Sequence, residues 1–91
     1  MLETTSTLIG PDDATTVSQL LTDIGRGSEV PSDIRAAAQF WSSEVNPEMD
    51  RVDLQTVGWL LRDAAAQRKV APANRDRARY WAAYIEGRTM R

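Results

Sequence analysis

The sequence predicts an all-α domain, a compact four-helix arrangement made from two tandem helical hairpins of 40 residues each. Three observations lead to this prediction. The chain aligns with itself at an offset of 40 residues, and each copy contains two segments whose apolar residues recur at helical spacing. No segment of useful length alternates apolar and polar residues as a half-buried β-strand would, since only Thr4–Ile9 is rich in β-favouring residues.

The internal repeat is the most informative of these observations. The offset gives eleven identities in 39 aligned positions without a gap, and it preserves the apolar pattern. The identical pairs are Asp13/Asp53, Thr16/Thr56, Val17/Val57, Leu20/Leu60, Leu21/Leu61, Asp23/Asp63, Val30/Val70, Arg35/Arg75, Ala38/Ala78, Trp41/Trp81 and Arg51/Arg91. Phe40/Tyr80 and Val45/Ile85 are similar pairs. The pattern indicates one helix–turn–helix unit present twice.

The first unit is expected to contain two helices. An N-cap at Asp12 or Asp13 starts the first, and Gly25 and Gly27 end it by supplying a left-handed turn. Its inward stripe is Ala14, Val17, Leu20, Leu21 and Ile24. Ser32 is expected to cap the second helix, and Asn46-Pro47 to end it. The inward stripe of that helix is Ile34, Ala37, Ala38, Trp41 and Val45.

The second unit repeats this plan. Its first helix is expected to start at Asp50 or Asp53, and its stripe is Leu54, Val57, Leu60, Leu61 and Ala64. Val70-Ala71-Pro72 forms the turn, because proline suits the first turn of a helix. The last helix is expected from about Asn74 to Glu86, with Ala78, Trp81 and Ile85 inward and Gly87 as its stop.

The two units are expected to form one domain. A single hairpin of this length cannot bury its own apolar stripe, whereas two hairpins can bury each other's. The predicted boundaries are a flexible arm over residues 1–11 and a helical domain over 12–91, divided into units 12–50 and 51–91. Trp41 and Trp81 occupy equivalent inward positions and are interpreted as core residues.

Composition argues against an enzyme. The chain has no Cys and no His, which excludes disulfides, thiolate or imidazole metal sites, and a histidine base. No glycine-rich phosphate loop is present, so the sequence predicts no cofactor. Residues 1–11 lack the features of a signal peptide, and no segment approaches the length of a membrane span. A cytoplasmic location and no membrane association are expected.

Charge is distributed unevenly along the chain. Residues 1–54 contain ten acids and three bases, a net charge of −7, and residues 55–91 contain eight bases and three acids, a net charge of +5. This asymmetry predicts either pairing between the two halves or a basic end that meets an anionic partner.

Two groups of residues are candidates for binding. Trp59 aligns with the polar Gln19, beside the inward stripe, so it either covers the edge of the bundle or, with Arg62, anchors a protein interface. A basic group around the second turn is the candidate for a nucleic acid or another anion: Arg68, Lys69, Asn74, Arg75, Arg77 and Arg79. A solvated basic face is the alternative for this group.

The sequence therefore predicts a small non-enzymatic protein that binds another protein, as an adaptor or inhibitor. Its Ala, Arg and Asp usage indicates a high-GC genome, and its size and surface fit a short helical accessory protein of phage or bacterial origin. A DNA-binding regulator that uses the basic start of the last helix is the first alternative. Self-assembly into a homo-oligomer, with the acidic half of one copy against the basic half of the next, is the second.

Overall fold

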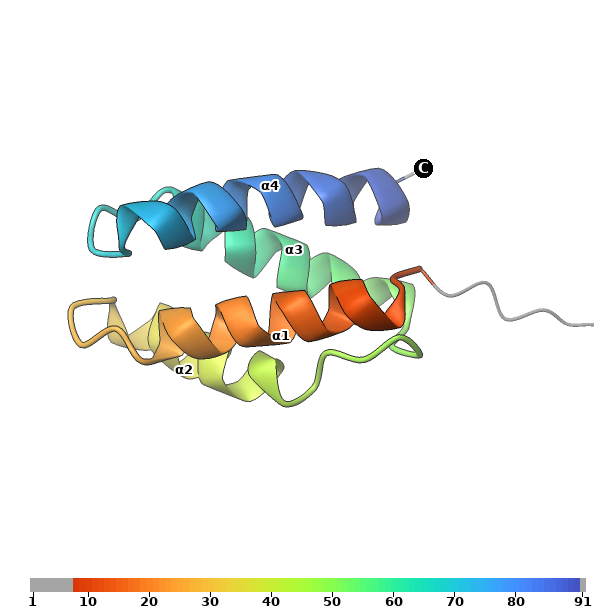
Figure 1. Cartoon of the computed structure of the whole chain (residues 1–91), viewed down its shortest axis with the longest axis horizontal. Helices are drawn as coiled ribbons and strands as arrows, with labels where there is room; N and C mark the ends of the chain where they lie inside the picture. The colour runs from red at the N-terminus through yellow and green to blue at the C-terminus, as the bar shows by residue number, and fades with distance from the viewer. Residues whose placement is uncertain (1–7, 91) are drawn as a thin grey trace, which may run out of the picture.

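Residues 8–90 are described by the computed structural model, and this part of the chain forms four α-helices (Figure 1). The helices are α1 (Pro11–Gly25), α2 (Ser32–Ser42), α3 (Arg51–Ala65) and α4 (Pro72–Thr89). The starts of α1 and α3, and of α2 and α4, lie 40 residues apart, at 11 and 51 and at 32 and 72. The four-helix prediction and the repeat of two hairpins are confirmed.

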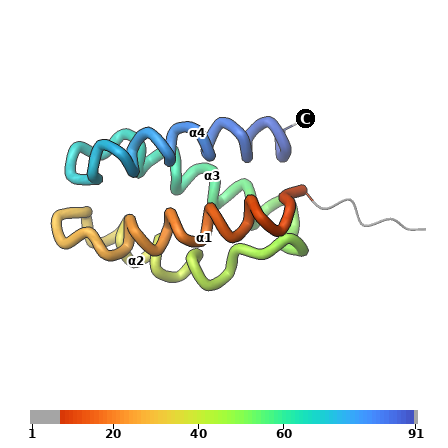
Figure 2. Tube along the Cα trace, viewed as in Figure 1, coloured from red at the N-terminus to blue at the C-terminus, as the bar shows by residue number. Residues whose placement is uncertain are grey.

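The helices form a bundle in which neighbours in sequence are neighbours in space. α1 packs mainly on α2 and α3 mainly on α4, and the smaller α1–α4 and α2–α3 contacts join the two hairpins. Both hairpin turns lie at the same end, so successive helices alternate in direction (Figures 1 and 2). A half-turn about the bundle axis therefore carries α1 to about the position of α3, and α2 to about the position of α4. The fold has an approximate two-fold axis in this sense.

Equivalent residues of the two hairpins fill the core. The pairs Val17/Val57, Leu21/Leu61 and Ala38/Ala78 are all completely buried. Val30 and Val70, which precede the second helix of each hairpin, are also buried. Burial of a Val or Leu side chain contributes about 1.5–3 kcal/mol, so the paired apolar stripes supply the main stabilisation that the sequence predicted.

Trp41 and Trp81 have similar surroundings, although Trp81 has a further edge-to-face contact with Tyr84, at a centroid distance of 5.2 Å. Both are partly buried and pack against the core. Each makes an edge-to-face contact with the aromatic residue before it, with ring centroids 5.1 Å apart for Phe40–Trp41 and 5.2 Å apart for Tyr80–Trp81. Phe40 and Tyr80 are themselves exposed.

The helix starts differ in part from the sequence expectation. Asp50 caps α3, and its Oδ1 accepts a hydrogen bond of 2.9 Å from the backbone N–H of Asp53. The expected caps at Asp12 or Asp13 and at Ser32 are wrong: Gly10 and Pro31 occupy these N-cap positions. Helical bonding begins one or more residues earlier than expected, since the Pro31 carbonyl already accepts from the N–H of Arg35 at 2.9 Å.

The glycines act differently from the expectation as well. No glycine in the described part of the chain has a positive φ, so neither Gly25 nor Gly27 supplies a left-handed turn. The equivalent residues Ala65 and Gln67 take the same turn without glycine. Gly25 instead allows close packing, because a Cβ there would lie 2.8 Å from Cγ of Gln39.

The helix ends also shift. α2 ends at Ser42, so Val45 lies beyond the helix although it still packs against the core. α4 continues through Gly87 to Thr89, three residues beyond the expected end at Glu86. The helical hydrogen bond from the Met90 N–H to the Glu86 carbonyl, 2.9 Å long, shows that Gly87 does not interrupt the ladder.

The chain before α1 is only partly described. The expected flexible arm over 1–11 lies largely outside the described residues. Of its described part, Ile9 is buried in the core, the Leu8 carbonyl accepts a hydrogen bond of 3.0 Å from Nε of Arg88, and Pro11 begins α1.

The helical state of Gly87 can be tested by substitution. A Cβ at this position meets no atom within 4 Å. We expect Gly87→Ala to raise the free energy of unfolding by about 0.5 kcal/mol, because alanine loses less conformational freedom than glycine in a helix. Urea denaturation measures the change. A loss of stability would instead indicate that Gly87 adopts the left-handed conformation of a helix stop.

A hydrogen bond between the hairpins can be tested by titration. The Tyr84 hydroxyl donates to Oδ2 of Asp13 at 2.9 Å, and this bond, together with burial, raises the pKa of Tyr84 above 10.0. The chain has two tyrosines, so Tyr84 is the sole tyrosine of a Tyr80→Phe variant. We expect its titration, followed by ultraviolet absorbance, to have a midpoint above 10.0 that falls when Asp13→Asn is added.

The sign of the linkage follows from the direction of this shift. A group whose pKa is higher in the folded state than in the unfolded state stabilises the fold. This stabilisation is complete at any pH below the unfolded-state pKa, and it is lost as the pH rises through the folded-state pKa. A midpoint unaffected by Asp13→Asn would contradict the hydrogen bond.

Candidate protein-binding surface

The outward side of α3 carries an apolar line. Val52 and Trp59 have exposed fractions of 67% and 51%, and Ala66, directly after the helix, is also exposed. The three residues are seven apart, or about two helical turns, so they lie along one side of α3, which we call the α3 face. The buried residues Leu54, Val57 and Leu61 lie on the opposite side and hold α3 in the bundle. Trp59 is therefore half-exposed on the outward side of α3.

The first hairpin supplies an internal comparison for this surface. The residues equivalent to Val52, Trp59 and Ala66 are Asp12, Gln19 and Arg26, all of them polar and exposed. The two hairpins thus share their buried positions but differ at these outward ones. The apolar line is a property of the second hairpin and is not required by the fold.

A shallow groove between α3 and α4 adjoins the α3 face. Its volume is about 440 Å³, and it is lined by Arg62, Ala65, Ala66, Arg79, Ala82, Ala83 and Glu86. Arg62 forms an ion pair with Glu86 across the groove. In the first hairpin, Gln39 lies along the corresponding seam and donates from Nε2 to the Gly25 carbonyl at 2.8 Å. The equivalent residues of the second hairpin, Ala65 and Arg79, both line the groove.

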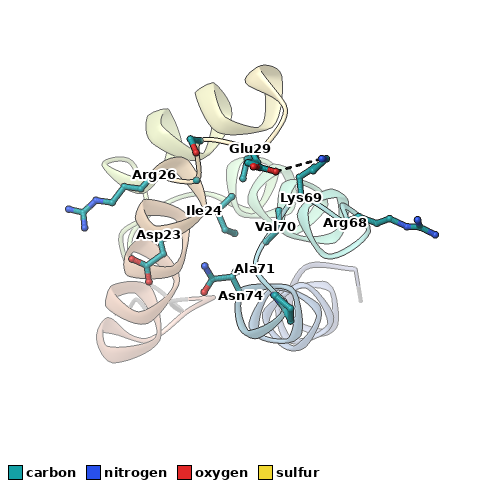
Figure 3. Close-up of a pocket in the computed structure, with 13 residues that line it drawn as sticks. Asp23, Ile24, Arg26, Glu29, Arg68, Lys69, Val70, Ala71 and Asn74 are labelled. Carbon is teal, nitrogen blue, oxygen red and sulfur yellow. Dashed lines mark ion pairs between the residues drawn. The ribbon is translucent and has the colours of Figure 1, made fainter.

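A larger open pocket lies at the turn end of the bundle, between the two hairpin turns (Figure 3). Its volume is about 800 Å³, and the buried side chains of Ile24 and Val70 lie among its walls. Nζ of Lys69 lies 3.6 Å from Oε1 of Glu29, a residue that occupies the equivalent position in the repeat. The guanidinium groups of Arg26 and Arg68 point away from the pocket (Figure 3).

The structure divides the predicted basic group. Arg68, Lys69 and Asn74 line the turn-end pocket, Arg79 lines the groove between α3 and α4 with Arg62, and Arg75 is partly buried. Three of the bases face carboxylates: Lys69 faces Glu29, Arg77 lies 4.0 Å from Asp23, and Arg79 lies 3.0 Å from Asp76. The basic residues therefore do not form one free cationic face.

Two of these pairs connect the acidic and basic parts of the chain. Glu29–Lys69 and Asp23–Arg77 each join the first hairpin to the second. Of the two explanations for the charge asymmetry, pairing between the halves is the one that the contacts support.

Sequence reasoning missed the groove and Val52. Alanine is a core or helix residue in most sequences, so Ala65, Ala66, Ala82 and Ala83 carried no signal of their own. The signal lay in the repeat: outward positions that are polar in the first unit and apolar in the second pick out Val52, Trp59 and Ala66.

The part of the chain that the structure describes was also searched for metal-ligand groups and membrane-spanning helices. Residues 8–90 contain no group of three or more acidic, His or Cys side chains placed to hold a metal ion. None of the four helices over this range is both long and apolar enough to cross a bilayer.

Comparison with known proteins gives no relative: no protein-family model, curated protein or solved structure matches the chain.

Proposed function

We propose that the chain is a small non-enzymatic adaptor or inhibitor that acts in the cytoplasm by binding another protein through the α3 face and the adjoining groove. The observation that carries the proposal is the half-exposed Trp59 on an otherwise well-packed helix. Tryptophan is enriched at the energetic centre of protein interfaces, because its large apolar area is removed from water on binding.

The surroundings of Trp59 fit such an interface. The alanines of the groove let a partner's backbone approach closely, while the Arg62–Glu86 pair and Arg79 supply polar groups at its edge. A central apolar anchor with a polar rim is the usual anatomy of a protein–protein interface. Lys69, Arg77 and Arg79 each lie within 4.0 Å of a carboxylate. This arrangement favours the proposal over a DNA-binding function, which depends on free cations along one face.

The proposal predicts that Trp59→Gln abolishes capture of the partner. Glutamine is the residue at the equivalent position of the first hairpin, so the substitution suits this helical environment. Loss of a central tryptophan typically costs about 2 kcal/mol or more, or about 30-fold in affinity. The immobilised chain is exposed to lysate of its source organism, captured proteins are quantified by mass spectrometry, and the affinity of each is then titrated.

Tyr80→Gln is the matched control, because Tyr80 is also an exposed aromatic residue, on α4. We expect wild type and Tyr80→Gln to retain the same proteins, and Trp59→Gln to lose them. Equal retention by all three would contradict a binding role for the α3 face.

A further inference from the structure

The approximate two-fold axis makes two boundaries of the bundle equivalent. The α1–α4 boundary corresponds to the α2–α3 boundary, and each joins one hairpin to the other. Residues 40 positions apart in the sequence therefore occupy equivalent places at the two boundaries and can be compared directly.

At the α1–α4 boundary, the acidic residues of α1 have partners. Oδ2 of Asp13 accepts a hydrogen bond from Tyr84, and Oδ2 of Asp23 lies 4.0 Å from the guanidinium group of Arg77. Both partners belong to α4.

At the α2–α3 boundary, the equivalent acids have none of these partners. Asp53 and Asp63 of α3 correspond to Asp13 and Asp23, but the residues equivalent to Tyr84 and Arg77 are Glu44 and Ala37. Over residues 8–90, no lysine or arginine nitrogen lies within 4.0 Å of either carboxylate. Asp53 and Asp63 are both exposed.

These two acids adjoin the apolar line of the α3 face. Asp53 follows Val52 directly, and Asp63 lies one helical turn beyond Trp59. The cation on the other side of Trp59, Arg62, is already paired with Glu86. Arg51, directly before Val52, donates to the Thr89 carbonyl and has no carboxylate within 4.0 Å among the described residues. Asp50, Asp53 and Asp63 outnumber it, so the charge left unpaired along residues 50–66 is negative overall.

From this arrangement we infer that the partner segment that binds the α3 face is a basic amphipathic helix, an inference that rests on the proposed function. Val52 and Ala66 are 14 residues apart, which is about 21 Å or four helical turns. A helix that presents apolar residues at a seven-residue spacing matches the line, and flanking lysines or arginines pair with Asp53 and Asp63. Charge complementarity thus selects a cationic partner over an acidic one.

The test uses two fluorescein-labelled peptides of 18 residues, one of leucine and lysine in amphipathic helical order and one with glutamate in place of every lysine. Fluorescence anisotropy measures their binding to the full chain. We expect the basic peptide to bind at least tenfold more tightly than the acidic peptide. Trp59→Gln and Asp53→Asn/Asp63→Asn should each weaken its binding at least fivefold.

A double variant with the same change in net charge serves as the control. Asp12 and Asp23 are exposed residues of α1, the helix that packs on α2 and α4, so Asp12→Asn/Asp23→Asn should alter peptide binding less than twofold. Circular dichroism of every variant confirms that the helices are retained. Equal binding of both peptides, or equal weakening by the control, would overturn the inference.

Two further outcomes separate this inference from the proposed function. Loss of the captured protein in Trp59→Gln without discrimination between the peptides would overturn the basic partner and leave protein binding intact. A second copy of the chain could also occupy the α3 face, and sedimentation equilibrium of the chain alone tests for it. A monomer at all concentrations agrees with a separate partner, and a dimer that Trp59→Gln dissociates would overturn the inference.

Discussion

The fold depends on the mutual burial of two apolar stripes, neither of which its own hairpin can cover. Val17, Leu21 and Ile24 of the first hairpin share one buried cluster with Val57, Leu61 and Ala64 of the second. A single hairpin of this length is not expected to bury such a stripe alone. Two units with similar stripes meet this requirement by packing about an approximate two-fold axis. Because the core occupies the space around this axis, the outward sides of the helices are the part of the molecule left for binding.

The repeat separates residues that the fold needs from residues that it does not. Several buried positions, such as Leu21 and Leu61, are identical in the two hairpins, whereas several outward positions differ in polarity or in charge. Glu29 and Lys69 show one use of this freedom: they occupy equivalent positions near the turns, carry opposite charges and pair with each other. The polar Gln19 and the apolar Trp59 show another, because the same outward site is solvated in one hairpin and apolar in the other.

The sequence was sufficient to predict the helices and their pairing, because helical periodicity and the repeat report directly on burial. It was less informative about helix ends. The N-caps at Gly10 and Pro31 have no side-chain bond to the helix, so no capping residue marked them. Gly25 was interpreted as a turn residue although its role is close contact with Gln39, a constraint that depends on the second helix and is invisible locally.

The candidate surface was predicted only at its anchor. Trp59 and Arg62 could be identified because a tryptophan off the inward stripe is unusual, but the groove beside them is formed by alanines from both α3 and α4. For Lys69 and Arg77, pairing depended on contacts with residues 40 or more positions away, Glu29 and Asp23. Periodicity places residues on faces and does not show which faces meet.

Native-state hydrogen exchange tests the mutual dependence of the hairpins most directly. If neither hairpin is stable alone, the backbone amides of Leu21 and Leu61 exchange only when the whole bundle unfolds. Their opening free energies should then agree within about 0.5 kcal/mol with each other and with the global value from urea denaturation. The account would be contradicted if the core amides of one hairpin had an opening free energy about 2 kcal/mol or more below that of the other hairpin's core amides.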